Sequence, residues 1–190
     1  GHEPRRFAAT LRLSGTSVAR DMDMDRLIAL LPLGVEIRGP VSGSRLQISA
    51  THEALEEAMR VLGATAAPAW LMERLKSGYG KTWEDLTVTE LSIPKDSGLI
   101  GKGVTTANVA ELYNIAILGV HDARRMWHGD RPANAEVEGN IVFGEGDIIL
   151  ATGAMPDLQK FARSENLLIL EGAKELPRTA KAPLALAIMA

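Results

Sequence analysis

The sequence predicts an α+β protein in which one arrangement of strands and helices occurs twice. Short runs alternate between apolar and polar residues as strands do, and other stretches place apolar residues at helical spacing. The order strand, helix, strand, turn, strand, helix is found in both halves of the chain. With 190 residues, of which 46% are hydrophobic and 24% charged, the chain can bury one good core or two small ones.

The first copy of this order spans residues 1–63. Residues 7–13 alternate as a strand, and 23–31 have apolar side chains at helical spacing until Pro32 stops the helix. Two further strands follow, one on each side of a turn. We expect the closing helix to begin after Thr51 as N-cap and to end at Gly63.

The second copy spans residues 86–172. Its predicted elements are, in order, a strand at 87–93, a turn at 94–98, a helix at 105–113, and strands at 115–121, 140–143 and 148–152, with a helix at 155–163. The run 115–121 is apolar almost throughout, which favours a central strand covered on both faces. The last helix has Pro156 and Asp157 in its first turn, where a missing N–H and a negative charge both fit.

Two further segments complete the predicted organisation. Residues 64–85 are predicted to form a helical connector, with Pro68 at a helix start. We expect Trp70 and Trp83, which flank it, to pack in the core at the junction, and the alternative for these rings is an interface between subunits. Residues 173–190 contain Arg178 and Lys181, followed by an apolar run at 182–190. This pattern predicts a linker and the start of a truncated transmembrane segment. The alternative for this run is a strand or helix folded onto the domain.

Composition argues against several classes of function. The net charge of -3 is a poor match for a phosphate backbone, so we expect no nucleic-acid partner. The absence of cysteine removes thiolate metal sites and cysteine nucleophiles. The four histidines are scattered, and no nucleophile-base-acid or paired-carboxylate arrangement follows from the spacing. We therefore expect no metal and no cofactor.

Two places are candidates for binding an anionic or nucleotide ligand. The first is the glycine-bearing turn at 97–102, where Ser97, Gly101 and Lys102 could offer hydrogen-bond donors and a positive charge. The second is a basic cluster with one aromatic ring, formed by Arg124, Arg125, Trp127, His128 and Arg131. The alternatives are a tight turn with a solvated lysine in the first place and a solvated hairpin in the second.

Several of these segments resemble a known family. The stretch 93–102, the strand at 115–120, and 146–153 with Leu158 resemble the TrkA-C (RCK-C) regulatory domain of potassium-conductance proteins. In that family a strand leads into a Ser-x-Leu-x-Gly-Lys turn, and a Gly-Asp turn opens the last long strand. The resemblance covers about 86–170. The first copy is degenerate, because 14–20 lack the glycine equivalent to Gly101, and Ser44-Arg45 replaces Gly146-Asp147.

The resemblance implies both a fold and a function. The fold would be two small antiparallel-sheet units with helices packed on one face, usually paired into homodimers. Tandem domains followed by a basic linker resemble the cytoplasmic loop of bacterial divalent-anion/sodium symporter-type permeases. This implies a non-catalytic, ligand-sensing module that acts on its own transmembrane domain at the cytoplasmic face of the cell membrane. The alternatives are a free-standing small-molecule or nucleotide-binding protein or enzyme, and a dimerisation scaffold of a potassium uptake system.

Overall fold

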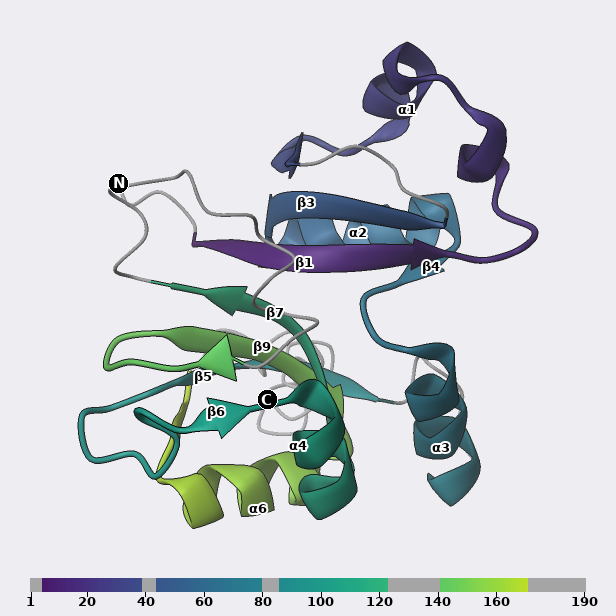
Figure 1. Cartoon of the computed structure of the whole chain (residues 1–190). Helices are drawn as coiled ribbons and strands as arrows, with labels where there is room; N and C mark the ends of the chain where they lie inside the picture. Colours follow the sequence, from purple (N-terminus) through teal and green to yellow (C-terminus); the bar gives the residue numbers. More distant parts are fainter. Residues whose placement is uncertain (1–4, 39–43, 80–85, 123–140, 171–190) are drawn as a thin grey trace, which may run out of the picture.

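The first half of the chain folds in the predicted order. The structure, a computed structural model, describes residues 5–38, 44–79, 86–122 and 141–170 (Figure 1). The first half contains β1 (Arg6–Leu13), a short 3-10 helix η1 (Val18–Asp21), α1 (Met24–Leu30), β2 (Val35–Ile37), β3 (Arg45–Thr51), α2 (His52–Leu62) and β4 (Ala64–Thr65). The Thr51 side chain accepts a hydrogen bond from the Ala54 N–H, and Gly63 ends α2 in the left-handed conformation. Both predicted caps of α2 are therefore confirmed.

The connector and the second half also follow the predicted order. The connector contains α3 (Ala69–Tyr79), which starts directly after Pro68. The second half contains β5 (Thr87–Ser92), β6 (Gly103–Val104), α4 (Thr106–Tyr113), β7 (Ala116–His121), β8 (Ile141–Val142), β9 (Ile148–Gly153), α6 (Met155–Glu165) and β10 (Leu168–Ile169). The sequence did not predict β4, β6 and β10, because a strand of two residues is too short to show a period.

The strands of both halves form one antiparallel sheet, so the predicted α+β class is confirmed. Its strand order is β10-β5-β9-β7-β1-β3-β2, with β4 also paired to β1, and β6 pairs with β8 in a separate two-stranded sheet. The resemblance implied two separate sheet units. In the structure the sheets of the two halves join, where Ala8 of β1 pairs with Val120 of β7. Strand β7 lies between β9 and β1, and every residue from Ala116 to Val120 is buried, so it is a central strand with both faces covered, as the sequence predicts.

The two halves have the same topology and the same strand register. The first half has the order β4-β1-β3-β2 and the second has β10-β5-β9-β7. Leu11 lies opposite Leu46 in the first half, and Leu91 lies opposite Ile149 in the second. In each half, the second strand of this pair, β3 or β9, leads into a helix of 11 residues, α2 or α6. The residue after each helix, Gly63 or Asn166, has left-handed backbone angles. The predicted domain boundaries at 1–63, 64–85, 86–172 and 173–190 stay a prediction.

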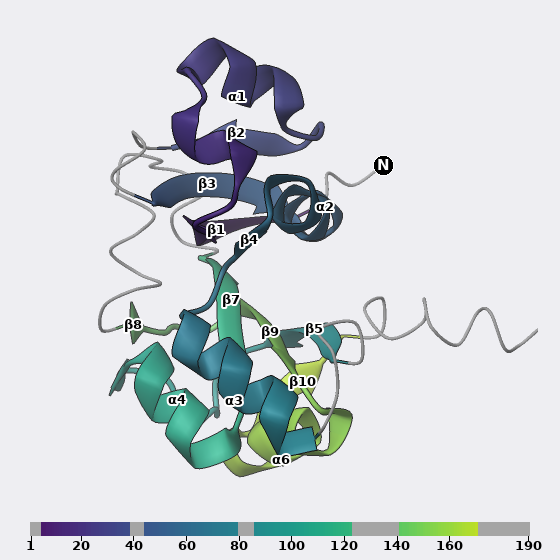
Figure 2. The same ribbon diagram turned by 90° about the vertical axis from the view of Figure 1, so that its right-hand side faces the viewer.

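The helices of the two halves cover opposite faces of this sheet (Figures 1 and 2). Phe7 of β1 belongs to the core cluster that also contains Leu55 of α2. Ala8 points to the other side of β1 and pairs with Val120, which packs in the cluster of Leu158. Because directly paired residues share a face, α2 and α6 lie on different sides.

The connector helix packs on the face of the second half that α6 leaves open. Leu71, Met72 and Leu75 of α3 are buried in the same cluster as Leu118 and Leu150 of the second half. Trp70 is 49% exposed, so the expected packing of its ring is wrong, and the buried leucines hold the connector instead. Trp83 and the predicted start of a transmembrane segment lie outside the described residues. Of the helices in the described ranges, none is long and apolar enough to cross a bilayer.

Candidate functional site

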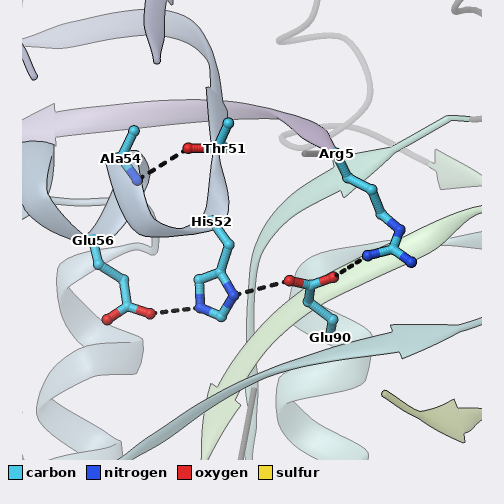
Figure 3. A network of polar contacts seen from close by, with 6 residues as sticks. All are labelled: Arg5, Thr51, His52, Ala54, Glu56 and Glu90. Carbon is cyan, nitrogen blue, oxygen red and sulfur yellow. Dashed lines mark hydrogen bonds and ion pairs between the residues drawn. The ribbon is translucent and has the colours of Figure 1, made fainter. Parts of the chain in front are cut away.

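A network of charged side chains lies where the two halves meet (Figure 3). His52, the first residue of α2, has Nδ1 2.9 Å from Oε2 of Glu90 on β5, and Nε2 2.5 Å from Oε1 of Glu56 one helical turn later. The Arg5 guanidinium donates to the other oxygen of Glu90 at 3.2 Å. Residues from the first half therefore hold a carboxylate of the second half from two sides.

The surroundings of His52 and Glu90 favour the charged form of both groups, as the directions of their pKa shifts indicate. Burial lowers the pKa of His52, but the carboxylates of Glu56 and Glu90 outweigh burial and raise it to about 9. The hydrogen bond from His52 lowers the pKa of Glu90, against the effect of its own burial. A protonated histidine at a helix N-terminus is disfavoured by the helix dipole, so the two carboxylates also compensate that effect.

A second histidine contacts the other half at the same junction. His121, at the end of β7, has Nδ1 2.9 Å from the carbonyl oxygen of Arg6, and its ring meets Phe7 edge-on at 6.1 Å between centroids. The junction thus combines the Ala8–Val120 strand pairing with contacts from two histidines, His52 and His121. Within the described parts of the chain, no group of three His, Asp or Glu residues could hold a metal ion.

The predicted turn at 97–102 uses its serine inside the protein. The Ser97 hydroxyl donates to the carbonyl oxygen of Glu165 at 2.7 Å and accepts from the Leu99 N–H at 3.2 Å. The Gly98 N–H donates to the same carbonyl oxygen at 3.0 Å. Ser97 therefore ties the turn to the C-terminal end of α6.

The other two residues of this turn have different environments. Gly101 has a φ of +78°, which favours glycine, and its N–H donates to the carbonyl oxygen of Phe143 at 3.2 Å. Lys102 is exposed. The structure places Ser97, Gly101 and Lys102 along one turn, and of the three the lysine is the side chain placed to reach a ligand. The basic candidates Arg124, Arg125 and His128 lie outside the described residues.

The first half repeats the serine contact. The Ser17 hydroxyl donates to the carbonyl oxygen of Leu62 at the end of α2 and accepts from the Ala19 N–H. In both halves a serine thus joins the turn after the first strand to the C-terminal end of the long helix. This serine contact is therefore a feature of the fold. The first half has it although that half lacks the glycine equivalent to Gly101.

Sequence reasoning missed the network at the junction. His52 and Glu90 are 38 residues apart, and no spacing rule connects them. The one available signal was Glu90 itself, a charged residue on the same face of β5 as Val88, which is partly buried.

Comparisons with known proteins do not add a family assignment. Neither the protein-family models nor the curated proteins include a match to this sequence.

Proposed function

We propose that this chain is a tandem regulatory module of a membrane transporter, located at the cytoplasmic face of the cell membrane and without catalytic activity. The observation that carries the proposal is the repeated topology, with equal register in both halves and a shared sheet. A duplicated unit with two joined copies is suited to report a change in one copy to the other. The TrkA-C-like segments of the second half support the same proposal.

The junction supplies a physical route for such a signal. The halves contact each other through the β1–β7 pairing, the salt bridges of Glu90, and a core cluster that contains residues of both halves. A ligand that binds one packing of the halves more tightly than another shifts the balance by its difference in affinity. We propose that the transmembrane domain of the same protein receives this change.

A homodimer is part of the proposal. Helix α1 buries Leu27 but leaves Met24 at 41%, Ile28 at 55% and the following Leu33 at 97% exposure. Met24 and Ile28 are four residues apart and share one face of α1. Exposed apolar residues close together on a surface are typical of interaction surfaces. This surface, defined by Met24, Ile28 and Leu33, supports pairing through α1.

A ligand screen tests the sensing role. Thermal unfolding of the purified protein is measured with nucleotides, cyclic dinucleotides and dicarboxylates, since a ligand bound by the folded state raises the unfolding temperature. We expect at least one anionic compound to raise the unfolding temperature. We also expect that compound to be recovered chemically unchanged after incubation with the protein. Conversion of that compound to a product would show that the protein is an enzyme. A stable dimer whose unfolding temperature no compound raises would show a dimerisation scaffold.

The transporter assignment has a separate test. The full-length gene is sequenced on both sides of the part that encodes residues 1–190. We expect hydrophobic stretches of about 20 residues that can span a membrane on both sides. A gene without such stretches would remove the transporter assignment and leave the repeated fold unaffected.

A further inference from the structure

The strand pairing that joins the two halves is short. Within the described residues, β1 and β7 pair only at Ala8 and Val120, whereas β1 pairs with β3 from Arg6 to Arg12 and β5 pairs with β9 from Thr87 to Ser92. A short ladder contains few backbone hydrogen bonds, so it contributes little of the attraction between the halves. Side-chain contacts beside this pairing therefore matter more for how the halves pack.

The ring of His52 faces a carboxylate with each of its two nitrogens (Figure 3). Nδ1 meets Glu90 of the second half, and Nε2 meets Glu56 of its own helix. An ionised carboxylate only accepts hydrogen bonds, and a neutral imidazole has a single N–H. A neutral ring would therefore place the lone pair of one nitrogen against a carboxylate oxygen. The positions of the two carboxylates require a ring with a proton on both nitrogens.

The carboxylate of Glu90 is stabilised by groups from the first half and from β7. Its side chain is only 14% exposed, and the positive or protonatable groups that act on it are His52, Arg5 and His121. The Arg5 guanidinium lies 3.2 Å away, but its side chain is 48% exposed, so water screens its attraction. Without the charge on His52, the carboxylate loses its largest stabilising contact, and a buried charge that loses its partner is costly.

The contact of His121 has no such requirement for a second proton. A carbonyl oxygen only accepts, so Nδ1 of His121 carries the hydrogen in the 2.9 Å bond to the Arg6 carbonyl oxygen. A neutral ring makes this bond as well as a charged one. With the Ala8–Val120 pairing, this contact can act as a hinge when the contact at Glu90 weakens.

We propose that loss of one proton from His52 loosens the contact at Glu90, so that the two halves change their packing while each keeps its own fold. Each half retains the ladder of its central strand pair and a long helix, α2 or α6. The proton is thus a ligand that binds one packing of the halves more tightly than the other.

The direction of this switch follows from the pKa of His52. Burial lowers this pKa, and Glu56 and Glu90 outweigh burial and raise it to about 9, so we expect the ring to hold its proton at neutral pH and to release it in alkaline solution. This role of His52 rests on the proposed signal between the halves and needs no membrane domain. It can therefore fail while the transporter assignment holds, and the reverse.

Methyl NMR from about pH 7 to about pH 10.5 follows the junction through this titration. The ring signals of His52 report its protonation, and the methyl groups of Ala8 and Val120 report the junction. The methyl groups of Leu55 and Leu158 report the cores around α2 and α6. We expect the Ala8 and Val120 signals to change together with His52, with a midpoint at about pH 9, while those of Leu55 and Leu158 stay in place.

A distance measurement shows whether the halves move. The sequence has no cysteine, so spin labels on Arg60→Cys of α2 and Lys160→Cys of α6, both exposed positions, are the only ones on the chain. Dilution into unlabelled protein limits the measured pairs to labels within one chain. By pulsed electron paramagnetic resonance we expect one set of distances at about pH 7 and a second, shifted set at about pH 10.5. Equal distances at both pH values would overturn the proposal.

Three variants in the methyl titration separate the proton of His52 from general effects of alkali. Glu56→Gln keeps the contact between the halves but removes a carboxylate that favours the charged ring, so the midpoint should move about 1 pH unit lower. Glu57→Gln is the matched control, because Glu57 pairs with Arg60, and it should leave the midpoint unchanged. His52→Gln should abolish the transition.

The outcomes that contradict the switch are distinct. A transition that persists in His52→Gln, or junction signals that do not follow the His52 ring, would overturn the proposal. So would a simultaneous change of the Leu55 and Leu158 signals, because this would show unfolding of the whole protein. If His52→Gln does not fold, the comparison of Glu56→Gln with Glu57→Gln decides, and equal midpoints in these two variants would overturn the proposal.

Discussion

At the scale of single residues, His52 shows how a positive charge is held at an unfavourable place. It stands at the start of α2, where the helix dipole favours an anion, and it is largely covered by its neighbours. Glu56 and Glu90 supply the negative charge that stabilises the protonated ring. Since Glu90 belongs to the second half, this stabilisation also favours the contact between the halves.

The pKa of His52 predicts a dependence of stability on pH. Because the pKa in the folded protein is raised to about 9 from 6.5, the stabilisation is complete below pH 6.5 and is lost as the pH rises through about 9. We expect His52→Gln to lower the free energy of unfolding by about 1–3 kcal/mol at pH 6 and by much less at pH 9.5. Urea denaturation at both values measures this. If His52→Gln lowered the free energy of unfolding equally at both pH values, the stabilisation by the protonated His52 ring would be contradicted.

At the scale of elements, strand β7 meets β1 closely because of a glycine. A Cβ added to Gly119 would lie 3.0 Å from the carbonyl oxygen of Ala8 and 3.1 Å from Cβ of Phe7. Both contacts are tighter than ordinary packing, and both belong to the other half of the chain. A side chain at this position would press on the junction.

Gly119→Ala is therefore expected to destabilise the protein. The added methyl group overpacks the junction, and we expect a loss of about 1–3 kcal/mol in the free energy of unfolding, measured in urea. Gly15→Ala is the matched control, because its Cβ would have no neighbour within 4 Å. A loss no larger than that of Gly15→Ala would show that the two strands are further apart than described.

Helix α1 gives a prediction for assembly. Ile28→Glu places a charge in the exposed apolar surface of Met24, Ile28 and Leu33, so it should convert the proposed homodimer to a monomer. Light scattering coupled to size-exclusion chromatography measures the mass. Leu112→Glu, at an exposed position of α4, serves as the control and should keep the dimer. A wild-type monomer at high concentration would refute pairing by this surface.

At the scale of the whole molecule, the repeat makes a quantitative prediction about its two serine contacts. Ser17→Ala and Ser97→Ala each remove a hydroxyl that joins a turn to the end of a long helix. We expect each to lower the free energy of unfolding by about 1–2 kcal/mol, with additive effects in the double variant because the sites lie far apart. Urea denaturation measures all three variants.

A local serine contact is the control for this pair. The exposed Ser77 hydroxyl bonds to the Glu73 carbonyl oxygen within α3, so Ser77→Ala should cost less than ~0.5 kcal/mol. A loss from Ser17→Ala as small as that of Ser77→Ala would mean that the first copy does not use the motif.

The sequence by itself determined the longer helices and strands and their order, because hydrophobic periods, the Thr51 and Gly63 caps and Pro68 act through neighbouring residues. It also indicated that 115–121 is a central strand, since an apolar run requires cover on both faces. Only the tertiary structure decided that the two sheets join through Ala8 and Val120, and that the helices lie on opposite faces. Pairing between distant strands depends on edges and shapes that no local pattern encodes, and so does the contact between His52 and Glu90.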